Sequence, residues 1–342
     1  MTQNRFVSHL RVVVITAILA FSVYFTVRNV KFGDLVSSFQ GVNYWLALSL
    51  VPIALFAHYV RAHRWKMILE HIAPHVRTSD LFAGVIVGYF MNNIIPRSGE
   101  FTRPYVTSRR DPNATYGSLF GTVVVERFID TIGLCMITVI VLLFDETLFQ
   151  GFDRLNGVDI KSFFIFWIGV LLVVILIAPT KLGFHVVEVL TKPMPTRFRE
   201  KILAVFINLQ KGFSALKTFK QIAVVSGETA AMYFLYWLPL YIMFFGFPGS
   251  QTSTPTMFDA MKVLALTGLA TAIAPTPGAF GIYHMTAQIA MKKFLLFSNS
   301  DALAYGTINH FVGYATIMIL GGYYLLAKDL SFRELLTPKQ TG

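Results

Sequence analysis

The residues that could do chemistry are charged side chains set in apolar sequence. Arg97, Glu100 and Arg103 follow the apolar run 81–91, within the stretch NNIIPRSGEFTRPYVTSRR. Guanidinium groups bind phosphate bidentately, and a helix beginning near Gly99 would direct its amide N–H groups at the same anion. Gly99 is expected to let the backbone turn, and Glu100 to pair with Arg103 three residues later. The stretch predicts a phosphate site; the alternative is an interfacial loop whose arginines bind lipid headgroups.

A second charged group, Glu126, Arg127 and Asp130, lies inside the apolar segment 115–144. A charge near the bilayer centre costs roughly 2.5–3.5 kcal/mol on insertion scales, so it needs a partner or a purpose. Glu126 and Asp130 share a helix face, and Arg127 reaches Asp130 at the i, i+3 spacing. The group predicts either an ion cluster that holds helices together or part of a binding site.

No motif for catalysis, metal binding or a cofactor stands out. The chain has no HExxH, no Gly-rich P-loop and no Ser-His-Asp arrangement. Cys135 is the only cysteine, which excludes disulfides and thiolate metal sites. We therefore expect no catalytic residue and no cofactor, with acid–base chemistry by Glu126 and Asp130 left open.

Composition indicates a membrane protein. Of the 342 residues, 55% are hydrophobic and 14% charged, whereas soluble domains are about a quarter charged. Six windows are apolar enough to span a bilayer: 10–27, 43–60, 115–144, 162–178, 221–246 and 311–327. We predict an all-α polytopic protein, with residues 1–342 forming one integral membrane domain. The net charge of +11 then reflects basic loops and not a nucleic-acid partner.

The distribution of basic residues predicts the orientation. The segment RAHRWK (61–66) and the loop 180–220 are basic, whereas 145–159 is acidic. Basic loops prefer the cytoplasm, so both termini are expected inside, in the inner (plasma) membrane. Arg28 and Lys31 fall on the opposite face, against this rule. Within 180–220, the apolar positions from Ile202 onward recur at helical spacing, which predicts an amphipathic helix along the cytoplasmic interface.

This orientation requires that 79–110 enter and leave on one side, as a re-entrant pair of half-helices. The segment 257–293 has the same form, with its break at Pro277 and Gly278. Aligning IPRSGEF with APTPGAF matches Pro96 to Pro275, Gly99 to Gly278 and Phe101 to Phe280. The sequence therefore predicts two inverted repeats, about 10–144 and 161–327. Each consists of two spans, a re-entrant hairpin and a span, as in secondary transporters.

The motifs PRSGEFTR (96–103), ERFID (126–130) and PTPG (275–278) resemble the flippase-like transmembrane family. Its best-known member is the membrane region of lysylphosphatidylglycerol synthase, the multiple peptide resistance factor. The resemblance covers nearly the whole chain and implies a lipid-translocating domain, here a stand-alone member without the synthase domain. The resemblance implies that the binding residues are Gly99, Glu100, Arg103, Glu126, Arg127, Asp130, Pro277 and Gly278. We add Arg97 to this set because it lies in the same charged stretch as Glu100 and Arg103.

The expected function is a flippase or transporter for a phosphate-bearing lipid of the phospholipid or polyprenyl-phosphate type. The headgroup would cross the inner membrane through a midplane cavity between the hairpins. The expected partners are lipids with anionic headgroups, together with a second copy of the chain or a separate lipid-synthesising enzyme. Two alternatives remain: an integral-membrane transferase acting on a lipid phosphate, and a secondary transporter of a small anion.

Overall fold

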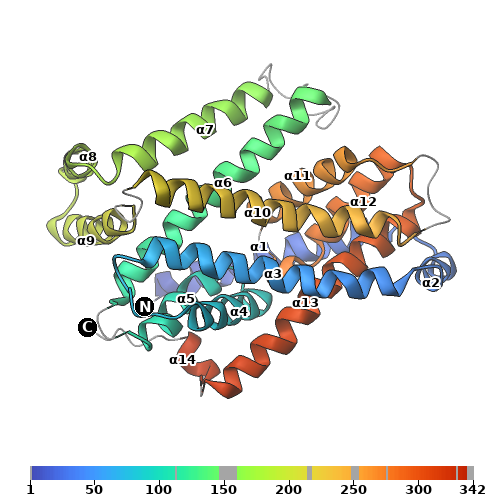
Figure 1. The fold of residues 1–342 in the computed structure, drawn as a ribbon, viewed down its shortest axis with the longest axis horizontal. Helices are drawn as coiled ribbons and strands as arrows, with labels where there is room; N and C mark the ends of the chain where they lie inside the picture. Colours follow the sequence, from blue (N-terminus) through green and yellow to red (C-terminus); the bar gives the residue numbers. More distant parts are fainter. Residues whose placement is uncertain are drawn as a thin grey trace. The chain divides into compact units, whose positions relative to one another are not determined.

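The computed structural model describes residues 2–111, 114–145, 160–213, 218–247, 254–274, 276–328 and 330–336. Among these residues all regular structure is helical, which confirms the predicted all-α class (Figure 1). The helices are α1 (Thr2–Val27), α2 (Phe32–Gln40), α3 (Tyr44–Leu69), α4 (Thr78–Ile94), α5 (Gly99–Ser108), α6 (Tyr116–Phe144), α7 (Ile160–Ile177), α8 (Lys181–Thr191), α9 (Thr196–Phe213), α10 (Phe219–Phe244), α11 (Met257–Ile273), the 3₁₀ turn η3 (Pro277–Ala279), α12 (Ile282–Leu295), α13 (Asn299–Ala327) and α14 (Phe332–Leu336).

The chain forms two compact units. Unit 1 consists of residues 1–56, 91–97 and 234–319, and unit 2 consists of residues 57–90, 98–233 and 320–342. In unit 1, α11 packs against α12, and α1 packs against α12. In unit 2, α6 is the central helix and packs against α5, α7 and α9. The division into two inverted repeats stays a prediction.

Four described helices are long and apolar enough to cross a membrane: α3, α6, α7 and α13. Helices α1 and α2, bent by 82° at the break between them, make a fifth if they count as one span. The sequence predicted six. The helix in the remaining window, α10, is 26 residues long. Glu228, Thr229, Trp237 and three Tyr residues lower its hydropathy.

Two helix pairs are interrupted where the sequence predicted breaks. The first break lies between α4 and α5, and α5 begins at Gly99 as expected. The residue that turns the backbone is Arg97, with φ of 63°, and not Gly99, so this prediction was wrong. The second break contains η3, where Gly278 and Ala279 are left-handed (φ 55° and 58°). Because a non-glycine residue pays a steric cost in this region, surrounding contacts must hold Arg97 and Ala279 in place.

The second of these pairs begins with an ordinary helix cap. Thr256 caps α11: its hydroxyl accepts from the backbone N–H of Asp259, and the Asp259 carboxylate accepts from the backbone N–H of Thr256. This reciprocal arrangement is a capping box, which satisfies amides that the helix leaves unpaired. Asp259 also pairs with Lys262 at 2.9 Å, at the i, i+3 spacing. Pro275, used in the repeat alignment, lies outside the described residues.

Glycines four residues apart let helices of unit 2 approach closely. On α6, a Cβ added at Gly121 would lie 2.4 Å from the backbone oxygen of Asn208 on α9, and one at Gly117 would lie 2.8 Å from the Asn208 amide nitrogen. On α4, a Cβ at Gly88 would lie 2.5 Å from Cγ of Arg103 on α5. Small residues at this spacing are typical of helix contacts in membranes. Gly88 therefore makes room for a charged side chain.

The predicted amphipathic helix is present as α9. Phe206 and Leu209 pack toward buried Val125 of α6, while Ile202 and Val205 remain 37% and 53% exposed. Gln210 donates to the carbonyl oxygen of Ala178, just after α7, at 2.9 Å. The helix therefore places part of its apolar face on α6. The apolar positions predicted from Ile202 onward extend to Leu216, which lies outside the described residues.

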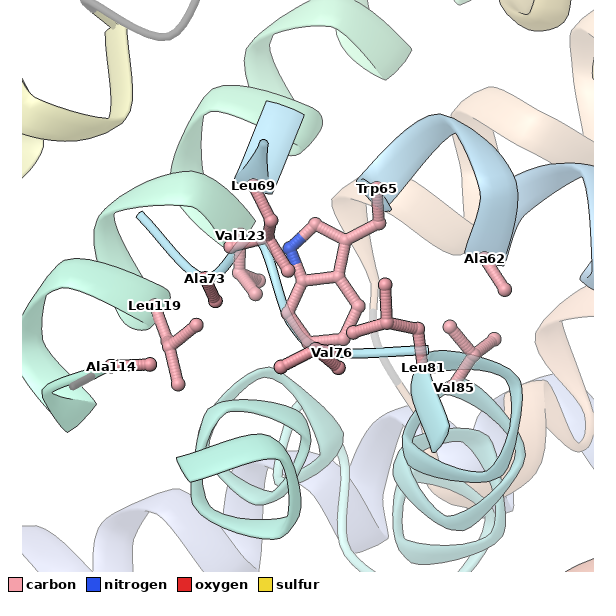
Figure 2. Close-up of a cluster of buried hydrophobic side chains, with 10 residues drawn as sticks. All are labelled: Ala62, Trp65, Leu69, Ala73, Val76, Leu81, Val85, Ala114, Leu119 and Val123. Atoms are coloured by element: carbon pink, nitrogen blue, oxygen red, sulfur yellow. The ribbon is translucent and has the colours of Figure 1, made fainter. Parts of the chain in front are cut away.

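A buried apolar cluster of unit 2 forms around Trp65 (Figure 2). Figure 2 shows the indole ring surrounded by small and branched aliphatic side chains from α3, α4, α6 and the connecting segments. The members are Ala62, Trp65, Leu69, Ala73, Val76, Leu81, Val85, Ala114, Leu119 and Val123. The indole N–H donates to Oγ1 of Thr122 at 2.9 Å, so the only polar atom of the ring is satisfied. Trp65 is thereby fixed beside the charged residues described next.

Candidate functional site

The charged residues of α6 meet two arginines of α3 inside unit 2. Arg64 Nη2 lies 3.0 Å from Oε1 of Glu126 and 2.6 Å from Oδ1 of Asp130, so one guanidinium bridges both acids. Arg61 Nη1 lies 3.0 Å from Asp130 Oδ2 and 3.6 Å from Glu126 Oε1. Arg127 reaches Asp130 at 3.4 Å, as predicted from their spacing. The two acids share a helix face, as expected, and that face is turned toward α3.

Arg103 of α5 completes this cluster from another side. Its Nη2 donates to Oε2 of Glu126 at 2.8 Å, and its guanidinium carbon lies 4.3 Å above the ring of Trp65. The Trp65 ring therefore makes a cation–π contact with the Arg103 guanidinium. The pair predicted between Glu100 and Arg103 is not formed among the described residues, because Arg103 turns to Glu126 on the neighbouring helix. Glu100 is half-buried at the start of α5.

The arginine cluster, defined as Arg61, Arg64, Arg103, Arg127, Glu126 and Asp130, contains more positive than negative charge. Four guanidinium groups face two carboxylates, which leaves a formal charge of +2. The buried Nε–H groups of Arg64, Arg103 and Arg127 have no acceptor among the described residues. A buried donor without an acceptor costs free energy, and more so when it is charged. The arrangement is suited to an added anion.

The cluster is closed at one end and open at the other. The side chains of Arg64 and Glu126 are fully buried, and that of Arg103 is 4% exposed. At the open end, Arg127 is 39% and Asp130 is 15% exposed. Arg127 and Asp130 are therefore the members of the cluster that a ligand can reach from outside the protein.

Helix α10 contributes polar groups next to the cluster. Arg64 Nη1 donates to the hydroxyl of Thr229 at 2.8 Å, and the Tyr233 hydroxyl donates to the backbone oxygen of Asp130. One residue before Thr229, the carboxylate of Glu228 hydrogen-bonds the ring of His63 on α3. These contacts fix α10 against α3 and α6, so the guanidinium groups are held in place before any ligand binds.

The remaining predicted residues lie at the two breaks. Arg97 is exposed and its Nη2 donates to the carbonyl oxygen of Ala272, one residue before α11 ends. The first break therefore contacts the helix that leads into the second, within unit 1. Gly99 is the buried first residue of α5. Pro277 and Gly278 form the turn η3, which confirms the break expected there.

Two histidines far apart in the sequence lie together beside this second break. The rings of His284 and His310 are 4.8 Å apart between centroids, and Nε2 of His310 is 2.6 Å from the carbonyl oxygen of Gly278. Phe280 packs on both rings, at 5.8 and 5.0 Å. Because the two residues lie far apart in the sequence, on α12 and α13, the sequence alone did not indicate this contact.

Sequence reasoning missed Arg61, Arg64 and Trp65. The segment RAHRWK stands in the sequence as a basic stretch after the second predicted span, whereas α3 continues through it to Leu69. A signal was present: Arg61 and Arg64 are three residues apart, the spacing that Arg127 and Asp130 share on α6. No residue pattern indicated that the two faces would meet.

The fold and the site describe a multi-pass membrane protein with an arginine–carboxylate cluster buried among its helices. The chain belongs to the family described as the lysylphosphatidylglycerol synthase TM region, which matches residues 9–321. The resemblance seen in the sequence is thereby confirmed, and with it a relation to membrane proteins that handle lipids.

Two archaeal relatives carry the name UPF0104 membrane protein. The one from Methanocaldococcus jannaschii is 24% identical over 268 residues, which are 75% of this chain and 77% of the relative. The one from Pyrococcus horikoshii is 22% identical over 291 residues, 78% of this chain and 82% of the relative. No solved structure matches the chain.

Proposed function

We propose that the protein translocates a phosphate-bearing lipid across the plasma membrane, with the phosphate passing the arginine cluster. The observation that carries this proposal is the cluster itself: a formal charge of +2 and, among the described residues, three buried Nε–H groups without an acceptor. A phosphate diester or monoester supplies both the negative charge and several acceptor oxygens. The family, with its relation to lipid handling, supports a lipid as the carrier of that phosphate.

Three finer elements belong to the same proposal. Each helix of the pairs α4–α5 and α11–α12 is shorter than any of the four candidate spans, and each pair is broken at left-handed residues, which supports re-entrant hairpins. The contact of Arg97 with Ala272 supports a route where the two breaks meet. The termini are placed in the cytoplasm by the charges of the loops. The acyl chains would remain in the bilayer while the headgroup passes.

A transferase is the less favoured function, because both acids of the cluster are engaged by arginines. Glu126 accepts from Arg64 and Arg103, and Asp130 from Arg61 and Arg64. A general base needs a lone pair directed at the substrate proton. We therefore propose that these carboxylates position the guanidinium groups and perform no proton transfer.

The test is Arg103→Lys in proteoliposomes containing a fluorescent phospholipid, with transport measured by quenching of label in the outer leaflet. Lysine keeps the charge, but its single ammonium cannot hold Glu126 and present a second, coplanar donor as the guanidinium does. We expect the phosphate interaction to weaken by about 1–3 kcal/mol, with transport reduced accordingly and thermal stability little changed. Arg109→Lys is the matched control, because Arg109 directly follows the same helix and its side chain is 43% exposed.

Three outcomes decide among the functions. Unchanged transport by the Arg103 variant refutes the proposed phosphate contact. Recovery of a chemically modified lipid from the wild-type vesicles would favour the transferase. Flux of an aqueous phosphate tracer without movement of the fluorescent lipid would favour a transporter of small anions.

A further inference from the structure

A second basic site lies in unit 1, where the ends of α1 and α12 meet the start of α13. A pocket of about 330 Å³ at this place is lined by Arg28, Lys292 and Lys293. None of the described residues that line it is a carboxylate. All three cationic side chains are exposed. An anion entering the pocket would therefore meet three positive charges, from the end of α1 and from α12.

The walls of this pocket are fixed by buried contacts. Gln288 of α12 is 5% exposed, and its amide donates to the backbone oxygen of Thr26 at 3.2 Å and to that of Asn299 at 3.1 Å. One side chain thus ties together the three helix ends that surround the pocket. At the other end of the α1–α12 contact, a Cβ at Gly281 would lie 2.2 Å from Oγ of Ser22, so the two helices are close there as well.

The pocket also presents the features that a lipid headgroup needs besides charge. The guanidinium carbon of Arg28 lies 4.2 Å over the ring of Phe25, a cation–π contact that holds the cation at the pocket. Phe25 and Ile289 give the pocket an apolar side, and Ile289 is 41% exposed. The cations would contact the phosphate of a lipid, and the adjacent apolar side chains would contact the beginning of its acyl chains.

A larger hollow of about 640 Å³ adjoins this pocket and shares Asn29 and Asn299 with it. Most of its lining residues are polar, among them Lys31, Asp34 and Asp301. The polar remainder of a headgroup can occupy this space while its phosphate stays at the three cations. Lys31, which lines the hollow, lies near Arg28 of the pocket. Both residues are on the non-cytoplasmic side in the orientation that the positive-inside rule predicts.

We infer that the pocket formed by Arg28, Lys292 and Lys293 binds the phosphate of a glycerophospholipid at the membrane surface. The inference deepens the proposed function and rests on it, since it assigns the lipid a docking place before or after its passage. The inference also explains why basic residues occur at the end of α1 and on α12. In the predicted orientation, these residues lie on the non-cytoplasmic side, where few basic residues are expected.

The test uses phosphatidylglycerol that carries a photoactivatable diazirine near its glycerol, in liposomes with the full-length protein, and maps the labelled residues by mass spectrometry. Label is expected on α1 and α12 around the pocket. In the triple variant Arg28→Gln, Lys292→Gln, Lys293→Gln, the amount of this label should be about tenfold lower than in the wild type, because removing charge-assisted hydrogen bonds to the phosphate weakens binding. The control is Lys181→Gln, Lys192→Gln, Arg197→Gln, which removes the same charge from exposed positions of unit 2.

Equal label in the triple variant and the wild type overturns the inference. A fall of the label in the control as well means nonspecific attraction and also overturns it. Competition by millimolar inorganic phosphate would identify a free-anion site and overturn the lipid assignment, whereas insensitivity to phosphate supports it. Lys292→Gln alone, at an exposed position, repeats the test with little risk to folding.

Failure of the proposed function is separable from failure of this inference. Arg103→Lys should reduce transport and leave the label at the pocket unchanged. If the wild-type protein moves no lipid but the triple variant still loses the label, transport is refuted and the pocket stands as a lipid site.

Discussion

Replacing Gly88 by Ala should displace Arg103 and disturb the arginine cluster. The added Cβ would lie 2.5 Å from Cγ and 3.0 Å from Cδ of Arg103, and 3.2 Å from the backbone oxygen of Gly99. To restore an ordinary contact of 3.4 Å, the stem of Arg103 must move by about 0.9 Å. The bond from Arg103 to Glu126 is now 2.8 Å, so a shift of this size away from Glu126 would exceed hydrogen-bonding range.

The expected cost combines two effects. Overpacking costs about 1–3 kcal/mol, and loss of a charge-assisted hydrogen bond about 1.5–3 kcal/mol, with partial relaxation reducing the total to roughly 2–4 kcal/mol. The apparent Tm in detergent should fall by several degrees, and lipid transport should fall with it. Gly322→Ala is the control, because a Cβ there has no atom within 4 Å.

A double-mutant cycle identifies the cause. In an Arg103→Ala background, the methyl group at position 88 no longer meets the arginine stem, so adding Gly88→Ala should cost much less than it does alone. Strict additivity of the two changes would refute the reasoning, as would an unaltered Tm for the single Gly88 variant.

Two further predictions follow from packing and from charge. Gly121→Ala should lower the Tm, because the added Cβ would lie 2.4 Å from the backbone oxygen of Asn208. Gly227→Ala is the control and should leave the Tm unchanged, because a Cβ there has no atom within 4 Å. Equal effects of the two substitutions would contradict the close contact between α6 and α9. In a variant without the native cysteine, Asn156→Cys should be labelled by an impermeant reagent from outside, and Arg197→Cys only after permeabilisation. Labelling of both from one side would contradict the predicted orientation.

Much of the architecture is determined by local sequence. Long apolar windows predict helices and a membrane location, because hydrocarbon leaves the backbone few alternatives. The breaks at 95–98 and around Gly278 could be expected from Pro and Gly. The i, i+3 pairs Asp259–Lys262 and Arg127–Asp130 also follow from spacing along one helix. The positions of these features depend on neighbours only a few residues away.

The composition of the site was decided by tertiary structure. Glu126 pairs with Arg64 and Arg103, from 62 and 23 residues away, and the local partner expected for Arg103 is not used. The pair formed by His284 and His310 likewise joins two helices. Which helix faces meet depends on contacts such as that of Gly88 with Arg103, which have no periodic signal in one sequence. The sequence by itself therefore determined that Glu126, Arg127 and Asp130 lie inside an apolar helix, and only packing decided that Arg61, Arg64 and Arg103 are buried beside them and which charges neutralise one another.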